Sequence, residues 1–198
     1  EDGQHHLWRN GHLPCASRTK VETLTAKSTK DFPLGVAGPV ANYLPTHDGL
    51  LLVCMYGILR YDYRTQTVVN TSYDMSLLDR QVSIRTALTD HKGNIYIGTS
   101  GRGVFIIPKG SRRLQPVESI HPKFDLASAN INALFEDKDH NLWASCYNKG
   151  LYLLSEGKNA FSSWLFSTQA IRLGSSVSSI APADEGGVWC TVQKSGIY

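Results

Sequence analysis

The chain has 198 residues, a length that suits one all-β domain, and its 19% charged and 41% hydrophobic residues argue against disorder. Its net charge of +3 comes from 20 basic and 17 acidic residues scattered along the chain, which disfavours nucleic acid as a partner. No apolar run has the length of a membrane helix, so we expect no direct membrane insertion of this segment.

In chain order, the sequence predicts short strands and tight turns rather than helices. The stretch HHLWRNGHLPC, from His5, has the pattern of a strand followed by a turn. Runs rich in Val, Ile, Tyr and Trp, bounded by Gly-containing turns, then predict antiparallel hairpins. The expected strands cover residues 83–90, 94–99, 103–107, 131–137, 141–146, 150–154 and 178–184, with weaker outer strands near 67–69, 114–117 and 161–166.

These strands belong to a repeat, the strongest signal in the sequence. Four segments align, and they begin at His47, His91, Asp139 and Glu185. Each has a glycine at the start of its last strand, and the intervals of 46, 47 and 46 residues separate Gly57, Gly103, Gly150 and Gly196. We expect these glycines to open the strand where a Cβ would crowd the turn or the neighbouring unit. We also expect a positive φ in the preceding hairpin turn at Gly49, Gly93 and Gly186.

An aromatic position keeps the same period. Tyr96, Trp143 and Trp189 are separated by 47 and 46 residues, and the first unit has Leu52 instead. Because the position recurs in successive units, we interpret these rings as flat spacers between neighbouring sheets rather than as a stacking platform for a ligand.

The repeat predicts a β-propeller. A four-stranded sheet of about 46 residues cannot bury both of its faces alone, and radial stacking of such sheets solves this problem. We expect a single β-propeller domain or fragment of about four blade-equivalents, with both ends cut from a longer, seven- or eight-bladed propeller. Closure of four blades by pairing of the two ends, and a larger ring shared by two chains, stay open as alternatives. The expected boundaries are a partial blade at 1–35, repeats at 36–80, 81–127 and 128–174, and a partial blade at 175–198.

The segment INALFEDKDHNLWASCYNKGLYLL, from Ile131 to Leu154, resembles the two-component regulator propeller repeat. That repeat has an apolar strand, Glu-Asp, a turn with glycine, Asn-Leu-Trp, a small-residue strand and a Gly-Leu-Tyr strand. This chain departs from it at His140, where the turn glycine is usual, at Leu52, and at Cys146, where threonine is common.

The resemblance implies the periplasmic part of a hybrid histidine kinase sensor of the Bacteroidetes type. It implies an oligosaccharide ligand, contacts with other domains of the parent sensor, and no catalytic activity in this segment. Two alternatives stay open: a structural or dimerisation spacer that self-associates, and a propeller enzyme such as a lyase or hydrolase.

The loops between the second and third strands of each unit offer the candidate ligand-binding residues. They present cationic and amide groups without an evident acid or base, which suits hydrogen bonding to a polar ligand better than catalysis. The candidates are Arg102, Tyr147, Asn148, Lys149 and Lys194, with solvated loop tips as the alternative interpretation. We assign no catalytic residue, because Glu136 and Asp137 are consecutive on a strand and face opposite sides.

Histidines and cysteines do not predict a metal or a cofactor. His47, His91 and His140 recur near the first turn of each unit, where we favour turn chemistry over zinc. The cysteines show no CxxC spacing, so we interpret them as small buried hydrophobes and leave a disulfide open; they are Cys15, Cys54, Cys146 and Cys190.

Overall fold

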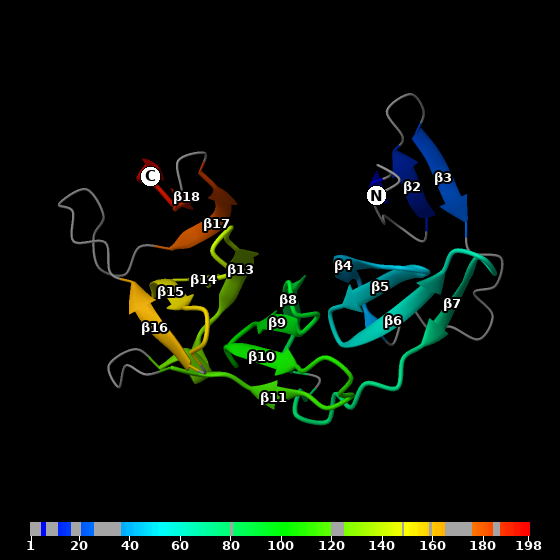
Figure 1. The fold of residues 1–198 in the computed structure, drawn as a ribbon, viewed down its shortest axis with the longest axis horizontal. Helices are drawn as coiled ribbons and strands as arrows, with labels where there is room; N and C mark the ends of the chain where they lie inside the picture. The colour runs from blue at the N-terminus through cyan, green and yellow to red at the C-terminus, as the bar shows by residue number, and fades with distance from the viewer. Residues whose placement is uncertain are drawn as a thin grey trace. The chain divides into compact units, whose positions relative to one another are not determined.

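The structure is a computed structural model that describes residues 5–6, 12–16, 21–25, 37–79, 81–119, 125–147, 149–158, 160–164, 176–183 and 187–198. They divide into two compact units, residues 1–72 and 73–198. Almost all described elements are β-strands (Figure 1). No helix in these ranges is long and apolar enough to cross a membrane.

Unit 1 contains two antiparallel sheets. The first has the order β1-β2-β3 and consists of β1 (His5–His6), β2 (His12–Ala16) and β3 (Val21–Thr25). The second, sheet I, has the order β4-β5-β6-β7 and consists of β4 (Val40–Thr46), β5 (Gly49–Cys54), β6 (Gly57–Asp62) and β7 (Thr67–Asn70). Every residue of β5 is buried, as its apolar sequence GLLLVC requires.

Unit 2 contains three sheets, in each of which the strands that begin with β8, β13 or β17 lie side by side in chain order. Sheet II consists of β8 (Ile84–Thr89), β9 (Ile95–Thr99), β10 (Val104–Ile107) and β11 (Gln115–Pro116). Sheet III consists of β13 (Ile131–Glu136), β14 (Leu142–Cys146), β15 (Gly150–Leu154) and β16 (Ala160–Trp164), with β12 (Glu118–Ser119) parallel to β16. Sheet IV consists of β17 (Val177–Pro182), β18 (Val188–Val192) and β19 (Gly196–Ile197), and the short 3-10 helix η1 (Leu126–Ser128) precedes β13.

The four sheets I to IV repeat one antiparallel meander, the topology of a propeller blade. We name the strands of each blade a to d in chain order. Each strand a carries an irregularity near its start, at Val40/Asn42, Ile84/Thr86, Ile131/Ala133 and Val177/Ser179. A bulge at this place increases the local twist of the sheet.

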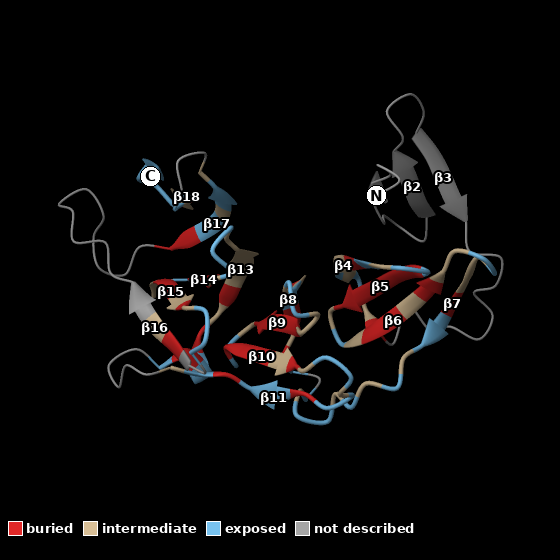
Figure 2. Cartoon of the chain, viewed as in Figure 1, coloured by how far each residue is buried: buried red, intermediate tan, exposed pale blue. Residues whose placement is uncertain are grey.

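Successive sheets of unit 2 pack face to face. Strand β13 lies beside β8 and β9 on one side and beside β17 on the other. Tyr96 of sheet II packs in one buried cluster with Leu142 and Tyr152 of sheet III, whereas Trp143 of sheet III packs with Val177 and other residues of sheet IV. Figure 2 shows buried residues along β9 and β10 of sheet II and at the start of β17 in sheet IV. The interpretation of Tyr96 and Trp143 as spacers therefore agrees with their packing.

Trp189 differs from this expectation, because the residue is 53% exposed. It lies on β18 in the last sheet, and no described strand follows that sheet in the sequence to cover the ring. The outer strands fall where the sequence predicts them, at β7, β11 and β16. The all-β propeller fold is confirmed, while the total blade number and the single-domain boundaries stay predictions.

The glycines have more varied roles than the period suggests. Gly93 has the expected φ of +84°, and Gly103 combines a φ of +67° with a Cβ position only 2.2 Å from the Leu126 carbonyl oxygen. Gly49 does not have a positive φ; a Cβ there would instead lie 1.9 Å from the Tyr61 carbonyl oxygen. Gly57 has open space around its Cβ position, so the expected crowding is wrong there. Gly186 lies outside the described residues.

Candidate functional site

The a–b turns of sheets II and III are built on the same Asp–Asn pair. The Asp90 carboxylate accepts hydrogen bonds from the backbone N–H and the side-chain amide of Asn94, both at 2.7 Å. In sheet III the Asp137 carboxylate accepts the same pair of bonds from Asn141. An aspartate that bonds the backbone a few residues later stabilises a tight turn locally.

Each asparagine also fastens the a–b turn to the c–d turn of its own sheet. The Asn94 side-chain oxygen accepts a bond of 3.0 Å from the backbone N–H of Lys109, and Asn141 accepts one of 3.1 Å from Glu156. The two turns of each blade therefore form one rigid end, opposite the b–c loop.

Asp137 is further held by Trp143, whose Nε1–H donates to the carboxylate at 2.8 Å. Burial raises the pKa of Asp137, but the bonds from Trp143, Asn141 and Asp139 outweigh it, so its pKa lies below the usual value. The Trp143 ring thus also stabilises the ionised form of the Asp137 carboxyl group.

His140 occupies a turn position with unusual backbone geometry. Its φ is +63°, whereas the equivalent residue of sheet II is Gly93 with a φ of +84°. Residues other than glycine rarely adopt this backbone conformation, because their Cβ atom approaches the following carbonyl oxygen.

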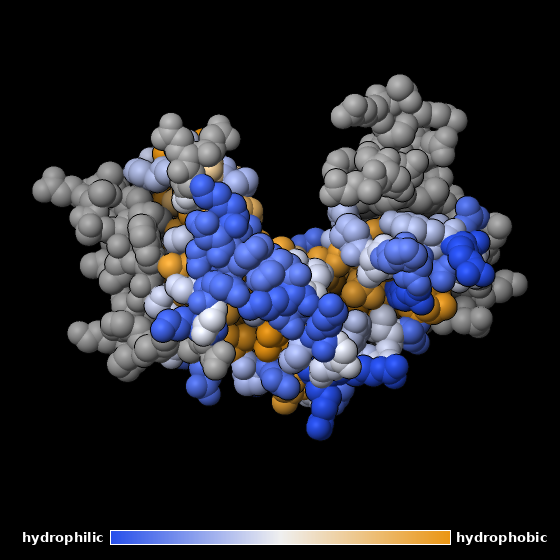
Figure 3. Space-filling model, viewed as in Figure 1, coloured by the Kyte–Doolittle hydropathy of each residue, from blue (hydrophilic) through white to orange (hydrophobic). Residues whose placement is uncertain are grey.

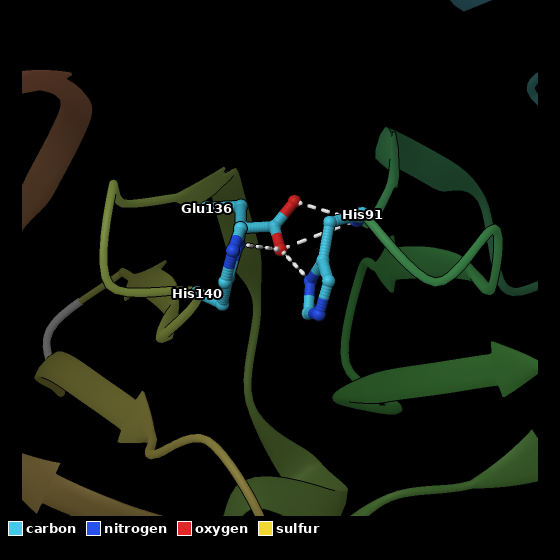
Figure 4. A group of neighbouring side chains, drawn as sticks. All are labelled: His91, Glu136 and His140. Atoms are coloured by element: carbon cyan, nitrogen blue, oxygen red, sulfur yellow. Dashed lines mark hydrogen bonds and ion pairs between the residues drawn. The ribbon is translucent and has the colours of Figure 1, made fainter.

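His140, His91 and Glu136 form a cluster between sheets II and III (Figure 4). Glu136 ends β13, and its carboxylate accepts bonds from the backbone N–H of His91 at 2.9 Å and from the His91 ring Nδ1 at 2.5 Å. The His140 Nδ1 lies 3.3 Å from the same carboxylate oxygen, Oε1. The two rings are stacked, with centroids 3.7 Å apart and an interplanar angle of 22°. Glu136 thus joins the turns of two neighbouring sheets.

This cluster lines a cavity of about 230 Å³. The Lys92 ammonium and the Glu156 carboxylate form an ion pair at 2.5 Å on its edge, again between sheets II and III. The apolar part of the lining consists of Tyr96, Ile106, Leu142 and Leu154. Figure 3 shows hydrophilic side chains gathered where β8 and β13 lie side by side. The cavity therefore has a charged rim and an apolar floor.

The residues predicted to bind a ligand lie at the opposite, b–c end of the strands. Arg102 and Tyr147 are exposed, and the Arg102 guanidinium lies 4.0 Å from Asp79. The Lys149 ammonium instead donates to the Asp125 carbonyl oxygen at 2.8 Å and to the Ser128 hydroxyl oxygen at 2.9 Å. Lys194 is exposed in the β18–β19 turn with a φ of +62°, and Asn148 lies outside the described residues.

One segment, residues 125–130, connects the two predicted loops of sheets II and III. The backbone N–H of Gly103 donates to the Ala129 carbonyl oxygen at 3.0 Å, and that of Tyr147 donates to Asn130 at 2.9 Å. Arg102, Tyr147 and Lys149 therefore flank a common segment, while Lys194 belongs to sheet IV. Their role in ligand binding stays a prediction.

From the sequence, each turn histidine was interpreted separately, and the role of Glu136 in joining His91 and His140 was not predicted. The strand alternation was correct, since Glu136 faces the neighbouring sheet and Asp137 faces its own turn. The aligned repeats also place His140 at the position of Gly93, a signal of strain that the sequence contains.

The cysteines that the structure describes are free and buried, as expected: Cys54, Cys146 and Cys190. Burial raises the pKa of Cys54 to about 11 and that of Cys146 to about 12, so their thiols are protonated and unreactive near neutral pH. The Cys15 side chain lies outside the description.

Residues 125–148 match the family model described as two component regulator propeller, which confirms the resemblance seen in the sequence. No curated protein matches the chain. Among solved structures, the extracellular domain of the hybrid two component system BT3049 from B. thetaiotaomicron is similar, with 20% identity, a TM-score of 0.66, and coverage of 94% of this chain and 24% of that one.

Two further structures show the breadth of this likeness. The extracellular domain of the one component system BT4673 from B. thetaiotaomicron has 15% identity and a TM-score of 0.67 over 98% of this chain and 26% of that one. An ancestral GH74 enzyme has 16% identity and a TM-score of 0.58 over 97% of this chain and 26% of that one. The chain thus spans about a quarter of the length of each of these proteins. At such identities the likeness establishes the propeller fold.

Proposed function

We propose that the chain is part of a ligand-sensing propeller in the periplasmic region of a two-component regulator. The observation that carries this proposal is the match of residues 125–148 to the two component regulator propeller repeat. The blade topology of sheets I to IV and the fold shared with two extracellular sensor domains support it. The parent protein would supply the kinase and the remaining blades.

An oligosaccharide is the ligand class that we propose, bound at the b–c end of the sheets. Tyr147 is 49% exposed and carries an aromatic ring, and Arg102 on the neighbouring loop presents an exposed guanidinium. An aromatic face combined with planar hydrogen-bond donors suits a sugar ring, which has apolar faces and a rim of hydroxyl groups. Lys149 contributes less, because its ammonium is already bonded within the chain.

A thermal-shift and calorimetric titration of the chain with a panel of plant and host oligosaccharides tests this function. One glycan family should raise the melting temperature, and Tyr147→Ala and Arg102→Ala should abolish the rise. Tyr56→Ala is the matched control, because Tyr56 is 44% exposed and its N–H donates to Ala37 as that of Tyr147 donates to Asn130. Loss of glycan binding in the Tyr56 variant alone would contradict this location of the site.

A structural spacer is the second candidate, and the bonds of Lys149 to Asp125 and Ser128 favour it, because they describe a loop that stabilises its own fold. A spacer would bind no glycan and would show a concentration-dependent mass by sedimentation. We assign no catalytic step, since Glu136 and Asp137 each bond to a different turn and face apart. The fold shared with a GH74 enzyme keeps glycan hydrolysis as a measurable control in the same titration.

A further inference from the structure

We propose that His91, Glu136 and His140 bind one divalent ion of the late first-row transition metals, with Zn²⁺ as the reference ion. One ligand atom of each residue lies within 4.8 Å of the others. Two imidazoles and one carboxylate form the donor set of open zinc sites, in which a fourth position is left for water or a ligand. This proposal does not depend on the sensing function, and it differs from our sequence interpretation, in which these histidines serve the turns alone.

The donor atoms already converge on one point. The Nδ1 atoms of His91 and His140 lie 2.5 and 3.3 Å from the same oxygen, Glu136 Oε1. The residues come from two sheets, since His91 follows β8 and the other two flank the β13–β14 turn (Figure 4). A metal ion would therefore link blades II and III at the edge of the cavity.

The backbone holds these donors at some conformational cost. Glu136 has a side chain only 15% exposed, and its carboxylate is oriented by the backbone N–H of His91. His140 adopts a φ of +63°, a conformation that Gly93 adopts freely in the equivalent turn. Non-glycine residues held in this conformation persist where the surrounding structure fixes them, and they cluster at functional sites. Turn formation alone would be better served by glycine, so the imidazole at this position needs a further reason.

Coordination follows from a small change in the present hydrogen bonds. On binding, each ring presents its Nδ1 lone pair to the metal and carries its proton on Nε2, so the contacts of both Nδ1 atoms with Glu136 Oε1 are replaced by bonds to the shared ion. The His91 Nδ1 to Oε1 distance opens from 2.5 Å to the roughly 3.3 Å spanned by two zinc bonds of about 2.0–2.1 Å. The rings rotate out of their stack, for which their 29% and 49% exposure leaves room.

Isothermal titration and thermal shift of the full chain with ZnCl₂ test the proposal. We expect one stoichiometric site with a rise in melting temperature, tighter binding of Cu²⁺, and no displacement by Mg²⁺. The decisive variant is His140→Gly, because glycine prefers this backbone conformation and the variant should fold at least as well. It should bind Zn²⁺ at least about 10-fold more weakly, since even outer-shell changes cost this much.

Glu136→Gln and His47→Ala complete the set. Glu136→Gln keeps the shape but removes the anionic ligand, so it should lose the site as His140→Gly does. His47 occupies the equivalent turn of sheet I and is exposed, so His47→Ala should bind Zn²⁺ as the unchanged chain does. Zinc binding that is undiminished in both His140→Gly and Glu136→Gln, or absent from the unchanged chain, overturns the proposal, whatever the outcome with oligosaccharides.

Discussion

Sheets II and III present two very different ends. At the b–c end, the loops are closed on residues 125–130 by backbone hydrogen bonds from Gly103 and Tyr147. At the a–b end, side chains of one sheet bond to the turns of the next, and His91 and Glu136 line a cavity of about 230 Å³. The end that the sequence favours for binding is thus held by backbone hydrogen bonds to one segment, while the opposite end collects convergent polar side chains.

The difference shows that charge on a loop is a weak guide to binding. Lys149 was a candidate because it is a cation at a loop tip, yet its ammonium donates one hydrogen bond to the Asp125 carbonyl oxygen and one to the Ser128 hydroxyl oxygen. In the sequence Glu136 was interpreted only as part of the repeat, yet its carboxylate bonds to His91 of the neighbouring sheet II. Convergence of several side chains from different blades is the stronger criterion.

The largest loss of stability should come from Gly103→Ala, which places a side chain in the tightly packed b–c end of sheet II. The new Cβ would lie 2.2 Å from the Leu126 carbonyl oxygen and the residue would keep a φ of +67°. We expect the free energy of unfolding to fall by roughly 3 kcal/mol or more, because both the backbone strain and a steric clash are added. Urea unfolding followed by tryptophan fluorescence measures it.

Gly110→Ala is the control for that experiment. Gly110 has a φ of +78° in the same sheet, but no atom lies within 4 Å of its Cβ position. Gly110→Ala should lower the free energy of unfolding only by the cost of holding alanine in the left-handed backbone conformation, about 1–2 kcal/mol. Equal losses in the two variants would mean that Gly103 does not approach η1 closely and that the b–c end is more open than described.

The a–b end should respond to acid through Asp137. Bonds from Trp143 and Asn141 lower the pKa of its carboxyl despite the opposing effect of burial, so the folded state prefers the ionised form. This stability is present above the unfolded pKa of about 3.9 and is lost as the pH falls through the lower folded value. Asp137→Asn should lower the free energy of unfolding near neutral pH by about 1 kcal/mol and flatten its dependence below pH ~4.

Asp139→Asn is the control for Asp137→Asn. It removes a negative charge from the same turn but leaves the hydrogen bonds to the Asp137 carboxylate in place. Asp139 is exposed and contributes its backbone N–H, not its carboxylate, to Asp137. Urea unfolding at a series of acidic pH values should therefore keep the full acid-dependent slope in this variant. The same flattening in both variants would refute the role of the Trp143 and Asn141 bonds.

The sequence predicted the blades well because hairpins are local. The repeat places the strands of sheets II and III within a residue or two, and its period of 46 to 47 residues identifies Tyr96 and Trp143 as interior positions. The site could not be predicted in this way, since His91 and Glu136 are 45 residues apart and meet only when sheet III stacks on sheet II. A period gives the order of the blades but not the distance between their turns. Trp189 shows the same limit, because its burial depends on a neighbouring sheet.

The smallest effect tests Lys149 directly against Lys194, a lysine of the corresponding b–c loop in sheet IV. Lys149 is half-buried and bonded to Asp125 and Ser128, whereas Lys194 is exposed. Lys149→Met keeps the alkyl chain and removes the donors, so we expect a loss of about 1 kcal/mol in the free energy of unfolding. Lys194→Met should leave it unchanged within about 0.5 kcal/mol, as surface substitutions do. If Lys149→Met instead left stability intact and weakened glycan binding, the ammonium would be directed to a ligand rather than to Asp125 and Ser128, and Lys149 would belong to the glycan site with Tyr147 and Arg102.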